Sequence, residues 1–137
     1  MAFKFEDLRI WTESVKFASE IYSLTSKFPR SEQFGLTSQL NRAAVSISLN
    51  IAEGEGRFSD ADLSRFIHIS IGSINEVVTI LHIARDQSYI NKEEFNKFYR
   101  RCENLSKMLH AFRGYLKRPS TIAHRLSTID HRPKGSF

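Results

Sequence analysis

Apolar residues recur at intervals of three and four through most of residues 1–118, and this spacing predicts helices. The first helix is expected over residues 5–27, because Pro29 forces the residue before it out of helical geometry. It carries two apolar stripes, which are Leu8, Trp11, Val15, Ala18 and Tyr22 on one side and Ile10, Phe17, Ile21, Leu24 and Phe28 on the other. One neighbouring helix is too little to cover both stripes, so the pattern predicts burial between subunits.

A second helix is expected over residues 36–53, where Gly54 and Gly56 follow as glycine often does at helix ends. Its main apolar stripe is Leu36, Leu40, Ala43, Ile47 and Ile51, and a second patch is Val45, Leu49 and Ala52. Between them runs a polar seam, spaced three or four apart, that consists of Gln39, Arg42, Ser46, Asn50, Glu53 and Arg57. Apolar surface on both sides of this seam predicts a mostly buried helix whose polar groups bond to one another.

A third helix is expected over residues 59–87, because Ser59 followed by Asp62 approximates a capping box. Its stripe keeps strict spacing of three and four through Leu63, Ile67, Ser70, Ile74, Val77, Leu81 and Ala84. Gly72 lies among small residues in the middle of this helix, where glycine costs about 1 kcal/mol relative to alanine. Close approach of a neighbouring backbone is the expected reason.

A fourth helix is expected over residues 91–118, from the capping pair Asn91 and Glu94 to a stop at Pro119. Its apolar seam is Phe95, Phe98, Cys102, Leu105, Leu109, Phe112 and Leu116. Short connections between four such helices imply antiparallel neighbours. The predicted fold class is therefore all-α, an antiparallel up-down-up-down four-helix bundle over residues 1–118 with a short, basic, flexible tail over residues 119–137.

Length and composition fit one soluble globular domain, with 137 residues, of which 41% are hydrophobic and 26% charged. The single cysteine, Cys102, excludes an internal disulfide and fits a reducing compartment. No uninterrupted apolar run approaches the roughly 18 residues of a membrane span. The first seven residues lack the apolar segment of a signal peptide. We therefore expect a cytoplasmic protein that makes no membrane contact.

The net charge of +5 is unevenly distributed. Residues 1–94 hold 10 Lys/Arg and 13 Asp/Glu, whereas residues 95–137 hold 10 Lys/Arg and 2 Asp/Glu, which gives −3 and +8. On a helical wheel the side chains of Arg100, Lys107 and Arg118 fall within about 20° of one another, with Arg101 and Lys117 on either side. This basic ridge favours binding of nucleic acid through its phosphates, and the alternative is an ordinary solvated helix face.

No set of residues in the sequence converges on catalysis or on a metal. His68, His82 and His110 do not have the spacing of a helical ligand pair, and no Glu-x-x-His motif of di-iron bundles is present. Cys102 lies on the apolar seam, so a buried structural thiol is expected rather than a nucleophile. We therefore predict a non-enzymatic protein without cofactor or metal.

With the segments laid out, residues 3–118 resemble the four-helix-bundle proteins encoded within 23S rRNA intervening sequences. The most specific run is residues 50–57, Asn-Ile-Ala-Glu-Gly-x-Gly-Arg, followed by Phe66 and by Gly72-Ser73-x-x-Glu76. The other matching motifs are Phe5-x-x-Leu8 with Trp11, Tyr22-x-Leu24-Thr25, Phe28-Pro29, Glu32-x-Phe34-Gly35-Leu36-Thr37-Ser38-Gln39-Leu40 and Arg42-Ala43-Ala44-Val45-Ser46-Ile47. The tail after Pro119 lies outside the resemblance.

The resemblance implies a four-helix bundle that assembles into a ring-like homopentamer. It also implies kinship to the accessory proteins of diversity-generating retroelements, which are basic, bind nucleic acid and contact a reverse transcriptase. It implies no catalytic residues. The family motif includes five polar positions that coincide with the polar seam, Gln39, Arg42, Asn50, Glu53 and Arg57. We predict that these hold helix ends and subunit contacts together. The alternative is that Arg42 and Arg57 line a basic pore or face, which Glu53 would partly neutralise.

Two functions remain open from the sequence. The first is a homo-oligomeric module that binds RNA or DNA, with RNA favoured, through the phosphate contacts of Arg100, Arg101, Lys107, Lys117 and Arg118. The second is a protein-binding or structural oligomer, for example an accessory subunit of a reverse transcriptase, whose basic surface is incidental.

Overall fold

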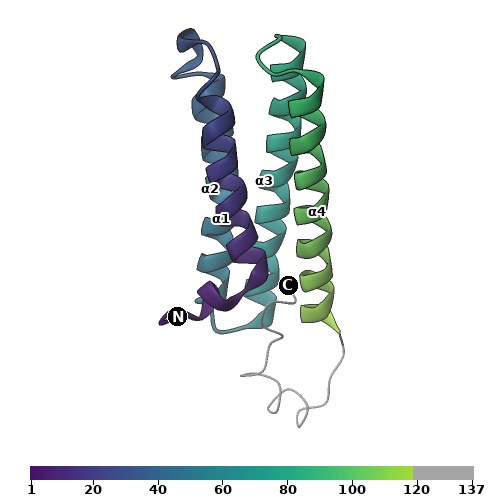
Figure 1. Cartoon of the computed structure of the whole chain (residues 1–137). Coiled ribbons are helices and arrows are strands. Elements are labelled where there is room, and N and C mark those ends of the chain that lie inside the picture. The colour runs from purple at the N-terminus through teal and green to yellow at the C-terminus, as the bar shows by residue number, and fades with distance from the viewer. Residues whose placement is uncertain (119–137) are drawn as a thin grey trace.

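The computed structural model describes residues 1–118, and the predicted tail over residues 119–137 lies outside the described part. The helices are η1 (Lys4–Asp7), α1 (Arg9–Thr25), η2 (Arg30–Glu32), α2 (Leu36–Glu55), α3 (Asp60–Asp86) and α4 (Lys92–Lys117), and the described residues contain no strand. Figure 1 shows the α1–α2 and α3–α4 connections at one end of the bundle and the α2–α3 connection at the other. The predicted antiparallel four-helix bundle is confirmed.

Helix α1 is shorter at both ends than the apolar spacing predicts. Leu8 has an extended backbone (φ −80°, ψ 126°), and this breaks the expected helix into the short turn η1 and α1 proper. The η1 turn is held by a hydrogen bond from the backbone N–H of Phe3 to Oε1 of Glu6, 3.1 Å long. It also places the ring of Phe5 edge-on to Trp11, with centroids 5.1 Å apart, so this segment packs against the first turn of α1.

The predicted N-terminal caps of the last two helices are confirmed. The backbone N–H of Asp62 donates to Oγ of Ser59 at 3.1 Å, so α3 begins at Asp60. Asn91 and Glu94 form a complete capping box, in which Oδ1 of Asn91 accepts from the Glu94 N–H at 2.8 Å and Oε1 of Glu94 accepts from the Asn91 N–H at 3.0 Å. These caps satisfy backbone donors that the helix itself leaves unpaired.

Gly56 is the C-cap of α2, as the sequence predicts, but Gly54 and Gly72 serve other purposes. Gly54 does not end α2, which continues to Glu55, but lies buried where α2 meets α3. A Cβ at Gly54 would lie only 2.7 Å from Cβ of Phe66. Gly72, in contrast, is exposed and has no atom within 4 Å of its hypothetical Cβ, so the predicted close approach at this position is wrong.

The close approach in the middle of α3 is made by its neighbouring serines. Oγ of Ser70, fully buried, donates to the carbonyl oxygen of Ile47 in α2 at 2.9 Å. One turn further on, the hydroxyls of Ser46 and Ser73 are hydrogen-bonded at 2.6 Å. Small polar side chains therefore let the backbones of α2 and α3 come together while their hydroxyls remain satisfied.

Helix α3 is long and apolar enough to cross a membrane by length and composition, although it contains no uninterrupted apolar run of about 18 residues. Its most apolar 18-residue window has a mean hydropathy of 1.4, and half of that window is buried inside the bundle. A central core helix passes the same test, because its buried residues pack against neighbouring helices on more than one side.

Candidate nucleic-acid interface

Two hollows lie along the α3–α4 helix pair, and we call the surface that contains both the α3/α4 groove. Its lining positions are Ala61, Ser64, His68, Asn75 and Val78 on α3, at intervals of three, four and seven, and Tyr99, Glu103, Lys107, Arg113 and Lys117 on α4, at intervals of four and six. The exposed Gly72 continues the same spacing between His68 and Asn75. The groove is hollowed at two places, with volumes of about 690 Å³ near the α2–α3 connection and about 350 Å³ nearer the opposite end.

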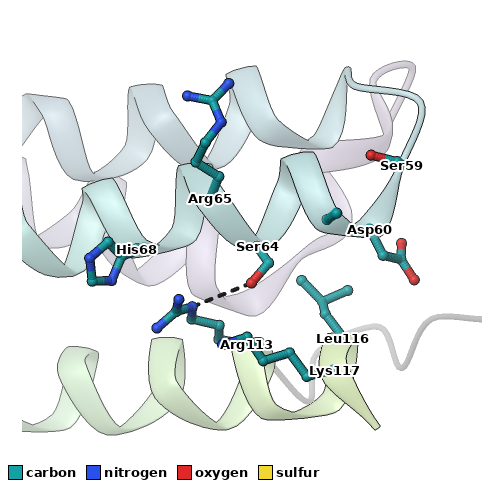
Figure 2. Close-up of a pocket in the computed structure, with 9 residues that line it drawn as sticks. Ser59, Asp60, Ser64, Arg65, His68, Arg113, Leu116 and Lys117 are labelled. Atoms are coloured by element: carbon teal, nitrogen blue, oxygen red, sulfur yellow. Dashed lines mark hydrogen bonds between the residues drawn. The ribbon is translucent and has the colours of Figure 1, made fainter. Parts of the chain in front are cut away.

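The larger hollow is lined by cationic side chains from two helices. We call it the basic hollow, after Arg65 and His68 on α3 and Arg113 and Lys117 on α4. In Figure 2 the Arg113 side chain extends from α4 toward Ser64 and His68, while Arg65 points away from α4 on the far rim. Nε of Arg113 donates to Oγ of Ser64 at 3.3 Å. This bond orients the guanidinium and leaves its two terminal amino groups for other acceptors.

An aromatic ring, that of Phe66, holds two guanidinium groups near the same end of the bundle. The guanidinium carbons of Arg57 and Arg65 lie 4.9 and 4.7 Å from the ring centroid of Phe66. Attraction between a guanidinium and an aromatic ring holds the cation without neutralising it. Arg57 also pairs with Glu53 at 2.6 Å, so of the two, Arg65 contributes more to the local positive potential.

Acidic groups are few along the groove. Asp60 lines the basic hollow and Glu103 lines the smaller hollow. Within residues 1–118, no carboxylate forms an ion pair with Arg65, Arg113 or Lys117. Cations that face a groove without carboxylate partners are suited to oxyanions such as phosphate, because the guanidinium group binds them in a fixed fork geometry.

The five residues predicted to bind nucleic acid do not form one cluster. Lys107 lines the smaller hollow of the groove and Lys117 lines the basic hollow. Arg118 caps α4 and its guanidinium lies 4.1 Å from the ring of Tyr115, while Arg100 is exposed on α4. These four remain on the surface of α4, as the helical wheel predicts.

Arg101 has a different environment from the other four. Its Nε and one terminal nitrogen donate to Oε1 of Glu20 at 3.0 and 2.5 Å. The other terminal nitrogen lies 3.6 Å from Oε2 of Glu13. These carboxylates belong to α1, so Arg101 ties α4 to α1 on the side where the bundle closes. Its part in nucleic-acid binding stays a prediction, but two carboxylates already compete for its guanidinium.

Sequence reasoning missed the residues that complete the basic hollow. Arg65 and His68 lie on α3, and Arg113 lies on α4 outside the predicted ridge. The hollow that they share is formed between two helices that run in opposite directions. A signal was nevertheless available. In an antiparallel hairpin the start of α3 must lie beside the end of α4, so cations near residue 65 and near residue 115 are brought together.

The polar seam of α2 lies at the surface of the single chain, so the expected mostly buried helix is not found there. Gln39, Arg42, Glu53 and Arg57 are exposed, and Asn50 is half-buried. The predicted bonding among polar groups is present in part, since Nδ2 of Asn50 donates to the Ser46 carbonyl at 2.8 Å.

Apolar side chains surround this seam. We define the α2 face as the shallow depression of about 590 Å³ lined by four residues of the seam and by eight others, which are Gln39, Arg42, Ser46 and Asn50 and then Tyr22, Ala43, Val45, Leu49, Ile69, Ser73, Glu76 and Ile80. Tyr22, Leu49 and Ile69 are 53%, 61% and 40% exposed. The excess apolar surface predicted for the first two helices is therefore present on the outside of the chain.

Within residues 1–118, no group of three or more His, Cys, Asp and Glu side chains has the geometry of a metal site. Cys102 is buried as predicted, and burial raises the pKa of its thiol to about 12. His82 packs edge-on against Phe95, with ring centroids 4.9 Å apart. Of the three histidines on α3 and α4, His68 alone lines the basic hollow.

Comparison with known proteins gives a family and a fold. Residues 6–111 match the sequence model of the family described as 23S rRNA-intervening sequence protein. A solved crystal structure of a protein of unknown function, from the S23 ribosomal protein family of Bacteroides thetaiotaomicron, is similar with a TM-score of 0.71 and 24% identity, covering 80% of this chain and 99% of that one. A search of curated proteins finds no match.

Proposed function

The chain belongs to the 23S rRNA-intervening sequence protein family, and we propose that it is a non-enzymatic, homo-oligomeric module that binds RNA through backbone phosphates. The proposed binding surface is the α3/α4 groove, with the basic hollow as its main anchor. Arg113 and Lys117 contact phosphate there, Arg65 adds positive potential from the rim, and Lys107 extends the contact along the groove.

One observation carries the proposal. The basic hollow brings together cations from two helices, and within residues 1–118 none of Arg65, Arg113 and Lys117 has a carboxylate partner. Such a cluster raises the electrostatic free energy of the unbound chain and lowers it when a polyanion neutralises the charge. Each neutralised phosphate also releases condensed counterions, which favours binding at low salt.

The groove supports backbone contacts better than recognition of base sequence. Its cations are the long side chains of arginine and lysine, which position a nucleic acid by its phosphates. The hollow near Lys107 adds only Asn75, Ser106 and Glu103 as short polar or acidic groups. We therefore expect an affinity that falls steeply with salt and depends little on sequence.

The homo-oligomeric part of the proposal rests on the α2 face. Tyr22, Leu49 and Ile69 are large apolar side chains that lie together over three helices, around polar groups able to hydrogen-bond across an interface. Apolar patches rimmed by polar residues are typical of contacts between subunits. The α2 face and the α3/α4 groove have no lining residue in common, so assembly through one leaves the other open.

The experiment that tests the proposal is a salt titration of RNA binding. Fluorescence anisotropy with a labelled structured RNA is measured between about 50 and 200 mM salt for the wild-type chain and for Arg113→Gln/Lys117→Gln. The double variant is expected to bind more weakly and to reduce the slope of log K against log salt by about 0.7 to 0.9 per lost contact. The matched control is Arg9→Gln/Lys16→Gln, which removes the same charge from exposed positions on α1.

A wild-type chain that fails to bind RNA at low salt contradicts the proposal. The second candidate function is then favoured, namely a protein-binding or structural oligomer such as an accessory subunit of a reverse transcriptase. The exposed apolar side chains of the α2 face support it, because a partner protein can cover the same surface as a second copy of the chain. An equal loss of affinity in both double variants places the RNA outside the groove.

A further inference from the structure

Phe58 is the most exposed large apolar side chain among the described residues, with 107% of its reference area open to solvent. It lies in the short connection between α2 and α3, directly before Ser59, which lines the basic hollow. No aromatic ring of residues 1–118 packs against it. An aromatic ring is therefore presented to solvent beside a cluster of cations.

The backbone on both sides of Phe58 is fixed. The N–H of Arg57 donates to the Gly54 carbonyl oxygen at 3.1 Å, and the Ser59 hydroxyl caps the start of α3. The connection is only four residues long, from Gly56 to Ser59. Stacking on a ligand therefore orders only the side-chain torsions of Phe58 and not the backbone of the turn, and this lowers the cost of binding.

The charge beside the ring indicates what covers it. Arg65, Arg113 and Lys117 line the same hollow as Ser59, the residue after Phe58, without carboxylate partners in residues 1–118, and a purely apolar partner would leave them unpaired. Proteins that bind single strands combine such a cationic track with aromatic side chains on which bases stack. Inside a duplex the bases are stacked on one another, so a protruding ring finds a base face only at the two ends.

We propose that the ring of Phe58 stacks on an unpaired base while the basic hollow holds the neighbouring phosphates, so that this end of the groove prefers single-stranded to duplex RNA. This inference rests on the proposed function and names the form of RNA that the site takes. The α2–α3 connection thereby provides the selective contact, and the two helices provide the sequence-independent one.

The test compares single-stranded RNA with a blunt duplex of the same sequence in the same anisotropy assay. Phe58→Ala is expected to weaken binding of the single strand at least fivefold, because stacking of one base on an aromatic ring contributes that much or more. Duplex binding should change less than about twofold. Phe58→Trp keeps an aromatic ring and is expected to retain the single-strand affinity.

The matched control is Phe34→Ala. Phe34 is 92% exposed and lies in the α1–α2 connection, at the opposite end of the bundle from Phe58 (Figure 1). Since neither ring is buried, both alanine variants are expected to keep the unfolding temperature of the wild type, and Phe34→Ala should leave RNA affinity unchanged. Thermal unfolding of each variant by circular dichroism checks that the fold is retained.

Three results with the Phe58→Ala variant would overturn the inference. They are equal loss of single-strand and duplex affinity in Phe58→Ala, no loss of either, and a change of the native mass of that variant in light scattering, which would place Phe58 in a subunit contact. If the wild-type chain binds duplex and single strand equally well, the stacking contact fails while the proposed phosphate binding stands. If the wild-type chain binds neither, the proposed function fails.

Discussion

Gly54 in α2 and Phe66 in α3 are in contact at a distance that only glycine permits. A Cβ at position 54 would lie 2.7 Å from Cβ of Phe66 and 2.9 Å from Cδ1 of Leu63. The obstructing atom at Phe66 is the first atom of its side chain, so it cannot move away without moving the α3 backbone. The guanidinium groups of Arg57 and Arg65 lie over the ring of Phe66. The close packing at Gly54 therefore also positions these two cations near the basic hollow.

We expect Gly54→Ala to destabilise the chain by about 1–3 kcal/mol, the usual cost of overpacking a close contact. Thermal unfolding followed by circular dichroism measures the effect as a lower melting temperature. Gly72→Ala is the matched control, because that glycine is helical, exposed and has no neighbour within 4 Å of the added methyl group. It should raise stability by about 0.5–1 kcal/mol. An unchanged melting temperature for Gly54→Ala would contradict the packing argument.

The ion pairs of Arg101 give a second prediction. Its guanidinium bridges Glu20 and Glu13 on α1, and its side chain is only 26% exposed. Arg101→Gln should therefore lower the free energy of unfolding by about 1 kcal/mol, at the upper end for such pairs. Arg100→Gln, one residue away and exposed, should change it by less than about 0.5 kcal/mol. Denaturant unfolding of both variants measures the difference, and equal stabilities would contradict the bridging role.

The pH dependence of stability includes a contribution from Glu32. Hydrogen bonds from the Leu36 backbone N–H and from the Tyr89 hydroxyl, 3.0 and 2.9 Å long, lower the pKa of its carboxyl group below the ordinary value of 4.5. A lowered pKa in the folded state contributes stability that is present above pH 4.5 and is lost as the pH falls through the folded-state pKa.

Glu32→Gln should therefore be less stable than the wild-type chain at neutral pH, and the difference should shrink as the pH falls below about 4.5. Urea unfolding at a series of pH values measures this. Tyr89→Phe removes one of the two donors and is expected to show a smaller version of the same trend. A stability difference that stays constant with pH would contradict the role of the charged carboxylate.

Assembly through the α2 face predicts how the native mass responds to one substitution. Leu49 is 61% exposed, so Leu49→Asp should not weaken the fold of the single chain. It should reduce an oligomer to smaller species in light scattering, because a buried charge without a partner is costly at an interface. Phe34→Asp, at a still more exposed apolar position outside the α2 face, is the control. A wild-type chain that is a stable monomer would contradict the proposed assembly.

Much of the fold follows from the sequence because each helix is marked by its own residues. The spacing of Phe95, Phe98 and Cys102, with the capping pair Asn91 and Glu94, predicts α4 within one residue of its observed bounds. The break at Leu8 carries no such local signal, since the same leucine fits the apolar stripe of a longer helix. The sequence predicts that Gly54 ends the helix. Its actual role in packing depends on Phe66, 12 residues away, which the local sequence does not reveal.

Less of the candidate site could be predicted, because it is made by two helices. A helical wheel places Lys107 and Lys117 on one surface of α4 but contains no information about Arg65 on α3. It also cannot show that Arg101, next to the ridge, faces the carboxylates of α1. The exposure of Phe58 depends on how the α2–α3 turn leaves the bundle, which apolar spacing does not predict.

Cross-linking to RNA tests the central claim most directly, which is that the α3/α4 groove is the surface that contacts nucleic acid. The chain is bound to RNA that contains photoreactive uridines, irradiated and digested, and the linked peptides are identified by mass spectrometry. The account predicts links to residues 58–68 and 107–118, which include the basic hollow and Lys107. Links concentrated on residues 39–50, where Arg42 belongs to the polar seam, would contradict it.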